Sequence, residues 1–403
     1  MEITKFIKNT PCACVCADTI ASALEKEGYK RIYNGKINSD KVYAVYGDST
    51  LIALRLDGAR GFNIIAAHSD SPAFRLKPGF LSGGRPTFEP YGGMIYSSWF
   101  DRPLSLAGKI VCERNGEYFT KTVNIDEDIA VIPGLAIHQS KDFDANRKIN
   151  PQTEMCPVFG VDLKEKINSF INSGERLVSA ELFLYDRTEP KTAGDLLISP
   201  RIDDLACVCS AFDAFMTSDT NNMKVLAVFN GEEIGSNTFE GADSTVLADI
   251  LKAACDYKGI DYAEAISSSM LISADNGHAF HENYPEKTDP DNKCFMGSGI
   301  MIKHHTNYTT TALTDALFSD ICKKEDVPVQ HFACRSDMRC GSTLGNINLR
   351  HIPIVSVDVG VPQLAMHSAC ETCSLTDIEY LRKAFTAFYQ TGIEFKNGIY
   401  KIK

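Results

Sequence analysis

The sequence lacks the features that mark several large classes of protein. No apolar run approaches the roughly 18 residues of a membrane-spanning helix. The Gly-x-Ser-x-Gly elbow of nucleophilic hydrolases and the Walker phosphate loop are also absent. These absences argue against a membrane protein, a serine or cysteine hydrolase and a P-loop nucleotide enzyme. The charged fraction of 23% is that of a folded chain rather than a disordered one.

Positive charge is in short supply. The chain has 41 Lys and Arg against 52 Asp and Glu, a net charge of -11. This balance argues against nucleic acid or an anionic membrane as a partner.

Near the N-terminus, Cys12, Cys16, Ile20 and Leu24 recur at four-residue spacing, and Asp18 interrupts the apolar patch. We interpret this segment as an amphipathic helix rather than a signal peptide, and we expect a cytoplasmic protein.

Cysteine, in contrast, is plentiful. In a cytoplasmic protein the 14 cysteines are expected to be reduced. The runs CACVC (12–16) and CETC (370–373) have a metal-like spacing. A structural zinc site usually needs two such pairs with a loop between them, and the first run lies on a helical face where Cys acts as a small hydrophobic residue. We therefore predict no structural zinc site.

Buried strands that alternate with helices indicate an α/β fold. Four apolar runs are typical of buried strands: 62–68, 224–230, 269–275 and 352–360. Amphipathic helices are predicted for 203–218 and 376–393, the second with a capping box of Thr376 and Glu379. This alternation favours a largely parallel sheet.

The stretch from about 76 to 194 has a different character. It contains many short runs and frequent turn residues. The length of 403 residues suits one large domain with an insert, or two to three domains. We therefore expect a β-rich insertion over 76–194, with 1–75 and 195–403 forming the α/β domain.

Residues that can bind metal ions stand at five predicted strand ends. They are His68 with Asp70, Asp203 with Asp204, Glu232 with Glu233, Asp275, and His367. In open α/β sheets, sites form beyond the carboxyl ends of the strands, so these side chains are expected to converge. Each also has an ordinary interpretation. Asp203 or Asp204 could cap a helix that begins near Leu205, and a single histidine is often only a hydrogen-bonded structural residue.

The converging set suits a hydrolytic site with two metal ions. Histidine and carboxylate ligands without thiolate suit Zn²⁺ or Mn²⁺. Two ions need a bridging carboxylate and about two further ligands each. Asp203 as the bridge, His68 with Asp275, and His367 with one adjacent glutamate satisfy this count. The other glutamate is then free to act as a general base, and the count alone allows either assignment of Glu232 and Glu233.

The motifs that surround these residues resemble those of a known family. They occur in the order found in the aspartyl aminopeptidases and span nearly the whole chain: AAHSDSP, WFDRPLSLAG, IPGLAIHQ, NPQTEM, SPRIDDL, NGEEIGS, SADNGHA, DMRCGSTLG and QLAMHSACE. The resemblance implies a di-zinc peptidase with a three-layer α/β/α, phosphorylase/hydrolase-like catalytic domain. It also implies an inserted dimerisation domain and a tetrahedral dodecamer built from dimers.

The resemblance also assigns roles to residues. It implies five metal ligands, with Asp203 rather than Asp204 as the bridge: His68, Asp203, Glu233, Asp275 and His367. It makes Glu232 the general base, and Asp70 the residue that orients His68. His138, in LAIHQ, matches a residue that reaches the active site of a neighbouring subunit.

Specificity and metal identity stay open at this stage. The family removes N-terminal Asp or Glu, which requires a cation in the pocket, and Lys303 in GIMIKHHTN matches the family lysine. The residues that follow, His304 and His305, depart from the pattern of other members. A preference for neutral residues such as Leu, a di-metal deacylase and an inactive shell are the alternatives. Zn²⁺, Mn²⁺ and Co²⁺ all suit the ligands.

Overall fold

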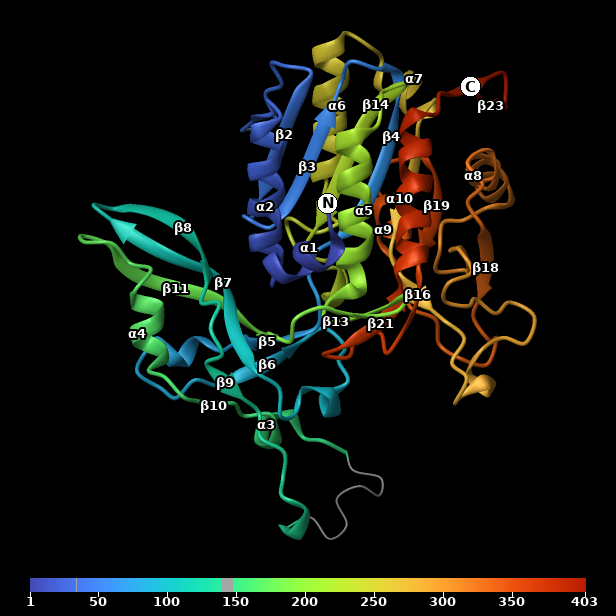
Figure 1. The fold of residues 1–403 in the computed structure, drawn as a ribbon. Helices are drawn as coiled ribbons and strands as arrows, with labels where there is room; N and C mark the ends of the chain where they lie inside the picture. Colours follow the sequence, from blue (N-terminus) through green and yellow to red (C-terminus); the bar gives the residue numbers. More distant parts are fainter. Residues whose placement is uncertain (34, 140–147) are drawn as a thin grey trace.

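A nine-stranded sheet is the largest element of the structure (Figure 1). The computed structural model describes residues 1–33, 35–139 and 148–403. From edge to edge the strands are β1 (Lys30–Arg31), β2 (Lys41–Tyr46), β3 (Thr50–Arg55), β14 (Asn222–Phe229), β4 (Ala59–His68), β15 (Met270–Ala274), β19 (Val355–Gly360), β17 (Ile300–His304) and β18 (Val329–Ala333). The central strands β14, β4, β15 and β19 are parallel and coincide with the four predicted runs. Their carboxyl ends therefore lie along one edge.

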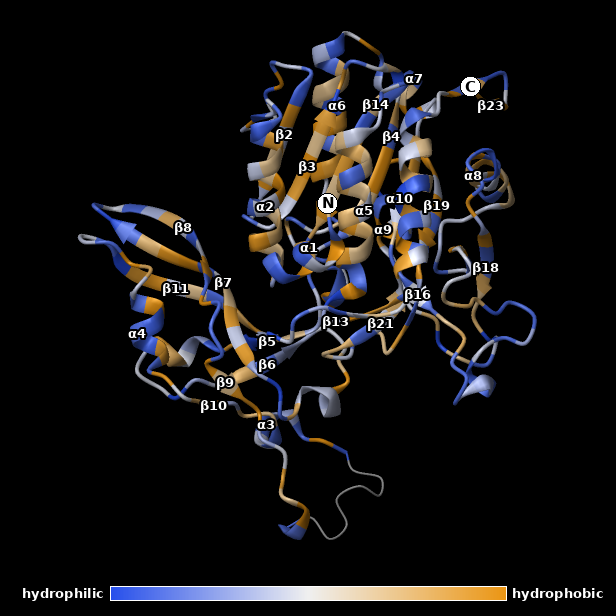
Figure 2. Cartoon of the chain, in the orientation of Figure 1, coloured by the Kyte–Doolittle hydropathy of each residue, from blue (hydrophilic) through white to orange (hydrophobic). Residues whose placement is uncertain are grey.

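Helices cover both faces of this sheet and complete three layers. One face packs against α1 (Ile3–Asn9), α2 (Ala13–Lys26), α5 (Ile202–Thr217), α8 (Ala312–Lys324) and α10 (Leu375–Gln390). The other packs against α6 (Val246–Lys258), α7 (Tyr262–Ser267) and α9 (Leu344–Asn348). Figure 2 shows that strands such as β3 and β4, which lie between these layers, are largely hydrophobic. The predicted α/β fold is confirmed.

The start of α10 differs from the prediction. The Oγ atom of Ser374 accepts a hydrogen bond from the Asp377 backbone N–H and caps the helix. Thr376 lies inside the first turn, and its hydroxyl donates to Asp195 instead. The predicted capping box of Thr376 and Glu379 is therefore wrong, because the helix begins before Thr376.

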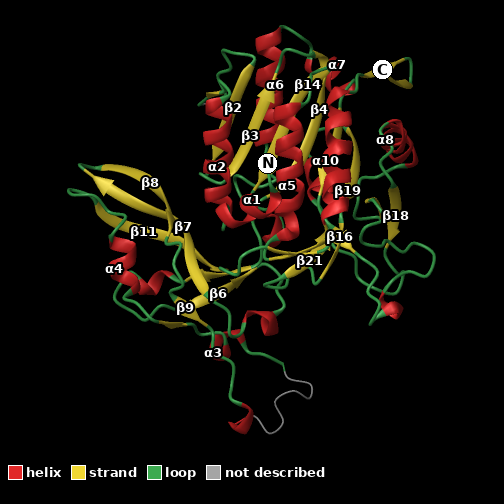
Figure 3. Ribbon diagram, in the orientation of Figure 1, coloured by secondary structure: helices red, strands yellow, loops and turns green. Residues whose placement is uncertain are grey.

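A second sheet has a hydrophobic core of its own and extends away from the helical layers (Figure 3). Its strands are β10 (Val158–Phe159), β9 (Ala130–Val131), β7 (Leu104–Arg114), β11 (Arg176–Asp186), β5 (Ala73–Leu76) and β6 (Phe88–Tyr91), with β8 (Glu117–Asn124) paired to β7. The short helices α3 (Pro151–Glu154) and α4 (Leu163–Asn168) accompany it. The predicted β-rich part is therefore present. Its boundaries at 76 and 194 stay a prediction.

A third sheet connects these two parts. Its strands are β12 (Lys191–Ala193), β13 (Leu196–Ser199), β21 (Glu371–Ser374), β20 (Pro362–Leu364) and β16 (Gly277–His278). A C-terminal hairpin of β22 (Ile393–Lys396) and β23 (Ile399–Ile402) follows α10. Short 3₁₀ helices are η1 (Pro78–Phe80), η2 (Tyr96–Trp99), η3 (Ile137–Gln139), η4 (Glu232–Ile234) and η5 (Pro285–Lys287). No helix in the described ranges is long and apolar enough to cross a membrane.

Candidate metal centre

The candidate ligands reach one place from two different sheets. His68 is the last residue of β4, Asp275 directly follows β15, and Glu233 lies in η4 just beyond β14. Asp203 follows β13 and His367 follows β20, and both of these strands belong to the third sheet. The carboxyl edge of the large sheet therefore supplies only part of the site, and the third sheet supplies the rest.

These five side chains, which we call the strand-end cluster, form two triads that share Asp203. The Nε2 atom of His68 lies 3.5 Å from Asp203 Oδ1 and 3.8 Å from Asp275 Oδ1. The Nε2 atom of His367 lies 3.6 Å from Asp203 Oδ2 and 3.4 Å from Glu233 Oε2. Each oxygen of Asp203 thus faces a different triad, which is the arrangement that a carboxylate bridging two metal ions requires.

Asp203 and Asp204 have separate environments. Both lack helical backbone angles, so the regular part of α5 begins only after them. The Asp203 carboxylate faces the two histidines, whereas Asp204 Oδ2 accepts a hydrogen bond of 3.3 Å from the backbone N–H of His68. Asp204 is fully buried beside the cluster and belongs to neither triad.

Asp70 holds the pair of adjacent glutamates. Its Oδ1 accepts a hydrogen bond from the backbone N–H of Glu232 (3.2 Å), and its Oδ2 accepts from that of Glu233 (3.1 Å) and from the Tyr91 hydroxyl (2.9 Å). The Nδ1 atom of His68 lies 3.1 Å from the Asp70 backbone oxygen and 3.5 Å from Asp70 Oδ1. Asp70 therefore fixes the Glu232–Glu233 turn as well as the ring of His68, and Tyr91 links both to the β-rich sheet.

Glu371 is a residue of the site that the sequence interpretation did not single out. Its Oε2 accepts a hydrogen bond from the backbone N–H of Asp203 (2.9 Å), and its Oε1 accepts from that of His367 (2.7 Å). The residue is buried. One carboxylate therefore holds the backbones of two candidate ligands, and its only signal in the sequence is its place four residues after His367.

The buried acids have strongly shifted pKa values. Burial raises the pKa of Glu232 to about 8. Burial and the nearby charge of Asp203 raise the pKa values of Glu233 and Glu371. Burial disfavours the charged form of His68, but its carboxylate neighbours, Asp203 first, outweigh this and raise its pKa. The site thus concentrates negative charge that a cation would stabilise.

The donor set fits divalent metal ions. In the described part of the chain, Asp203 Oδ1 and Glu233 Oε1 are shielded from solvent and have no hydrogen-bond partner. A buried carboxylate oxygen without a donor is costly, and a coordinated cation removes that cost. Imidazole and carboxylate ligands without thiolate suit a zinc site and exclude an iron–sulfur or blue-copper site.

The other two predicted site residues lie in contrasting places. The side chain of Lys303 is buried, and its Nζ donates to Asp275 Oδ2 and to the Asn276 backbone oxygen, both at 3.1 Å. It therefore contacts a candidate metal ligand directly. His138 is exposed in η3 of the β-rich part and does not belong to either triad of described residues.

Comparison with known proteins gives the family. The model of the aminopeptidase I zinc metalloprotease family (M18) matches residues 6–389. The chain belongs to the M18 family. This M18 protein is 36% identical to the probable M18 family aminopeptidase 2 of Clostridium novyi, over 96% of this chain and 98% of the relative. It is 34% identical to the probable M18 family aminopeptidase 2 of Pseudomonas entomophila, over 96% and 97%. The protein is therefore a metal-dependent aminopeptidase, and the deacylase and inactive-shell alternatives fall away.

Solved structures agree with this M18 fold. The chain aligns with a TM-score of 0.89 and 30% identity to a structure described as the Ape4 and Nbr1 complex, covering 96% of this chain and 84% of that one. An M18 aminopeptidase from Thermotoga maritima aligns with a TM-score of 0.82 and 21% identity, over 96% and 94%. A structure described as the mApe1 dodecamer of S. cerevisiae aligns with a TM-score of 0.80 and 21% identity, over 96% and 95%. The last two likenesses concern the fold.

Proposed function

We propose that this M18 aminopeptidase removes N-terminal acidic residues from peptides at a centre of two divalent metal ions. His68 and Asp275 would hold one ion, Glu233 and His367 the other, and Asp203 would bridge them. The observation that carries the proposal is the shared position of Asp203, whose two oxygens face separate triads. Zinc is the first candidate, with Mn²⁺ or Co²⁺ as alternatives.

Glu232 is the proposed general base. Bound metal ions would polarise the peptide carbonyl and activate a water molecule. Glu232 would accept a proton from that water and pass it to the leaving amine nitrogen. Its backbone N–H is held by Asp70, and the charges of His68 and Asp275 act on its carboxyl group. Asp70 also orients the ring of His68, so it acts by positioning other groups rather than by contacting substrate.

Lys303 is the proposed contact for an acidic side chain. Its ammonium group has three N–H donors, and Asp275 and Asn276 accept two hydrogen bonds from it. The third donor could meet a substrate carboxylate. The same geometry favours a second candidate, a preference for neutral residues such as Leu, because Lys303 is buried and already paired with Asp275.

A panel of Asp-, Glu-, Leu- and Lys-terminal peptides decides between these specificities. We expect kcat/KM to be at least about tenfold higher for the acidic pair, which corresponds to about 1.4 kcal/mol. Lys303→Met should lower kcat/KM for the Asp- and Glu-terminal peptides more than it lowers kcat/KM for the Leu-terminal peptide. Equal loss on both substrates would show that Lys303 supports only Asp275. Chelator should stop all cleavage, added metal should restore it, and an N-acetylated Asp peptide should resist the enzyme.

We propose that the protein assembles into a tetrahedral dodecamer built from dimers, in which His138 reaches a neighbouring active site. The β-rich part exposes large apolar side chains, among them Tyr118 and Val158, and Leu135 and Ile137 are exposed beside His138. Such exposed apolar residues are typical of surfaces covered by a partner. Light scattering tests the assembly by comparing the particle mass of Tyr118→Asp with that of wild type. His138→Ala should lower kcat while it leaves the mass of the particle unchanged.

A cytoplasmic location completes the proposal. All 14 cysteines are free thiols in the structure. Free thiols are expected in a reducing compartment. Cell fractionation with a tagged chain would test the location.

A further inference from the structure

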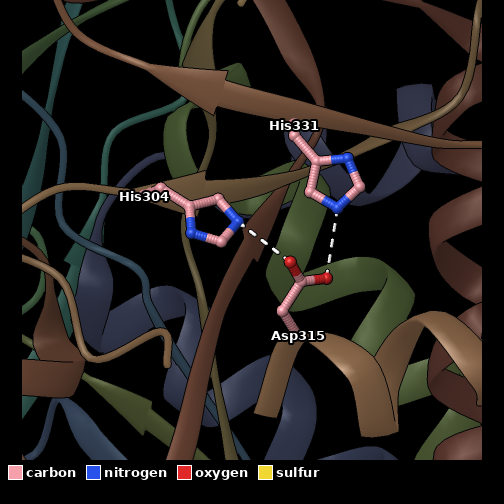
Figure 4. A group of neighbouring side chains, drawn as sticks. All are labelled: His304, Asp315 and His331. Carbon is pink, nitrogen blue, oxygen red and sulfur yellow. Dashed lines mark hydrogen bonds and ion pairs between the residues drawn. The ribbon is translucent and has the colours of Figure 1, made fainter. Parts of the chain in front are cut away.

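A second histidine–carboxylate group lies at the outer edge of the large sheet (Figure 4). It consists of His304 at the end of β17, His331 in β18 and Asp315 in α8, and we call it the edge cluster. The Nε2 atom of His304 lies 3.2 Å from Asp315 Oδ2, and the Nε2 atom of His331 lies 3.1 Å from Asp315 Oδ1. Both rings therefore point at one carboxylate.

The register of two parallel strands creates this arrangement. Residue 302 pairs with His331, and His304 pairs with residue 333. His304 and His331 therefore project from the same face of the sheet, two residues apart. Helix α8 packs on this face, and Asp315 lies in its first turn. The hydroxyl of Ser319 donates a hydrogen bond of 2.9 Å to Asp315 Oδ1 and helps to fix the carboxylate.

The geometry and chemistry of the edge cluster are those of a metal site. Ligand atoms bound at about 2.0–2.1 Å around a tetrahedral ion lie about 3.3 Å apart, close to the two N–O distances here. Within residues 1–33, 35–139 and 148–403, His304 Nε2 is shielded from solvent and has no aligned hydrogen-bond partner, although the carboxylate lies only 3.2 Å away. In the tautomer that carries its proton on Nδ1, the Nε2 lone pair would point to where a cation can bind.

The edge cluster as a whole is nevertheless partly open to solvent. The side chains of His304, His331 and Asp315 are 35%, 50% and 21% exposed. An ion could therefore enter, and water could occupy its remaining positions. A carboxylate that merely accepts hydrogen bonds from two imidazoles would not leave the His304 nitrogen without an aligned partner.

The edge cluster is distinct from the strand-end cluster. Successive residues of a strand point to opposite faces, so Lys303 faces Asp275 while His304 faces α8. The edge cluster also shares no residue with the two triads of the strand-end cluster among the described residues. The M18 function therefore does not account for this group.

We propose that the edge cluster binds one divalent transition-metal ion through His304, His331 and Asp315. Two imidazoles and one carboxylate suit zinc, cobalt or nickel better than calcium or magnesium. The ion would join β17, the outermost strand β18 and α8 at the free edge of the sheet. The ion would have a structural role, and water would occupy its remaining coordination positions.

Metal content of matched variants tests the proposal. Metal-free full-length protein is equilibrated with Zn²⁺ buffered at about 1 µM, where a site with a Kd of 1 µM or tighter is at least half filled. We expect His331→Gln and Asp315→Asn each to bind about half to one Zn²⁺ per chain less than wild type. His305→Gln is the control, because His305 neighbours the cluster without belonging to it.

The outcome does not depend on the catalytic centre. Every variant keeps the strand-end cluster. The zinc bound there therefore cancels when the zinc content of a variant is subtracted from that of wild type, even if the strand-end cluster binds fewer than two ions. Equal zinc content in wild type, His331→Gln and Asp315→Asn would overturn the proposal. Aminopeptidase activity near the wild-type level would confirm that the variants are folded.

Discussion

The strand-end cluster and the edge cluster contain similar side chains, but the chain surrounds them differently. His68, Asp203 and Glu233 have almost fully buried side chains, and two carboxylate oxygens there find no donor among the residues that the structure describes. The edge cluster has one carboxylate for two imidazoles and is partly open to water. The comparison teaches that an excess of buried negative charge, rather than the ligand type, marks the centre where metal is indispensable.

The largest effect is expected for Glu233→Gln. The substitution removes the carboxylate of a proposed ligand in the second triad and leaves a neutral amide beside Asp203 and His367. We expect loss of at least one metal ion per chain and a fall in kcat/KM of about a thousandfold or more. Metal analysis and kinetics on one preparation measure both. His331→Gln, the counterpart in the edge cluster, should leave kcat/KM unchanged. Full metal retention in Glu233→Gln would exclude it as a ligand.

Glu232→Gln should separate chemistry from metal binding. A positioned general base contributes about 10²–10⁴-fold, so kcat should fall by that factor while the metal content stays at the wild-type level. The neighbouring Glu233→Gln is the matched control, because the two side chains share one turn held by Asp70. Retention of full kcat in Glu232→Gln would refute its role as base.

Glu371→Gln should have an intermediate effect. In the wild type, Glu371 accepts hydrogen bonds from the backbone N–H groups of Asp203 and His367. The Gln amide keeps one acceptor oxygen, but its NH₂ group would face the other backbone N–H. Groups that orient ligands typically contribute 10–100-fold to metal affinity, and we expect a loss of about that size. Competition with a chelator measures it. Glu371→Asp, which keeps the charge, should recover part of the affinity, whereas an unchanged affinity in Glu371→Gln would remove the positioning role.

Much of the strand-end cluster could be predicted from the sequence because its members end recognisable apolar runs. His68 is the last residue of β4, and Asp275 directly follows β15. Glu371 escaped notice because its partners are backbone N–H groups, which no pattern of side chains reveals. His304 and His331 lie together only through the pairing of β17 with β18. That register depends on tertiary packing, so the edge cluster could not be read from the sequence.

The metal-free protein should lose stability as the pH rises. Glu232 has a folded pKa of about 8, above the roughly 4.3 of an unfolded chain. Between these values the folded state binds more protons than the unfolded state, so the free energy of unfolding falls with rising pH. The raised pKa of His68 acts in the same direction above its ordinary value. Melting of chelated protein from pH 5 to 8 should show this slope, and Glu232→Gln should make it less steep, since the raised pKa values of Glu233, Glu371 and His68 remain. Identical slopes in wild type and Glu232→Gln would contradict the raised pKa of Glu232.

The smallest effect is expected for the edge cluster without metal. His331 is half-exposed, and its ion pair with Asp315 is solvated. Such pairs contribute about 0–1 kcal/mol, so His331→Gln should change the free energy of unfolding of chelated protein by less than about 1 kcal/mol. Added Zn²⁺ should then stabilise wild type more than His331→Gln, because an ion that binds only the folded edge shifts the unfolding equilibrium. Denaturant titrations with and without Zn²⁺ measure the difference. A large destabilisation of chelated His331→Gln would mean that the histidine pairs already hold the sheet edge, and that the cluster works without an ion.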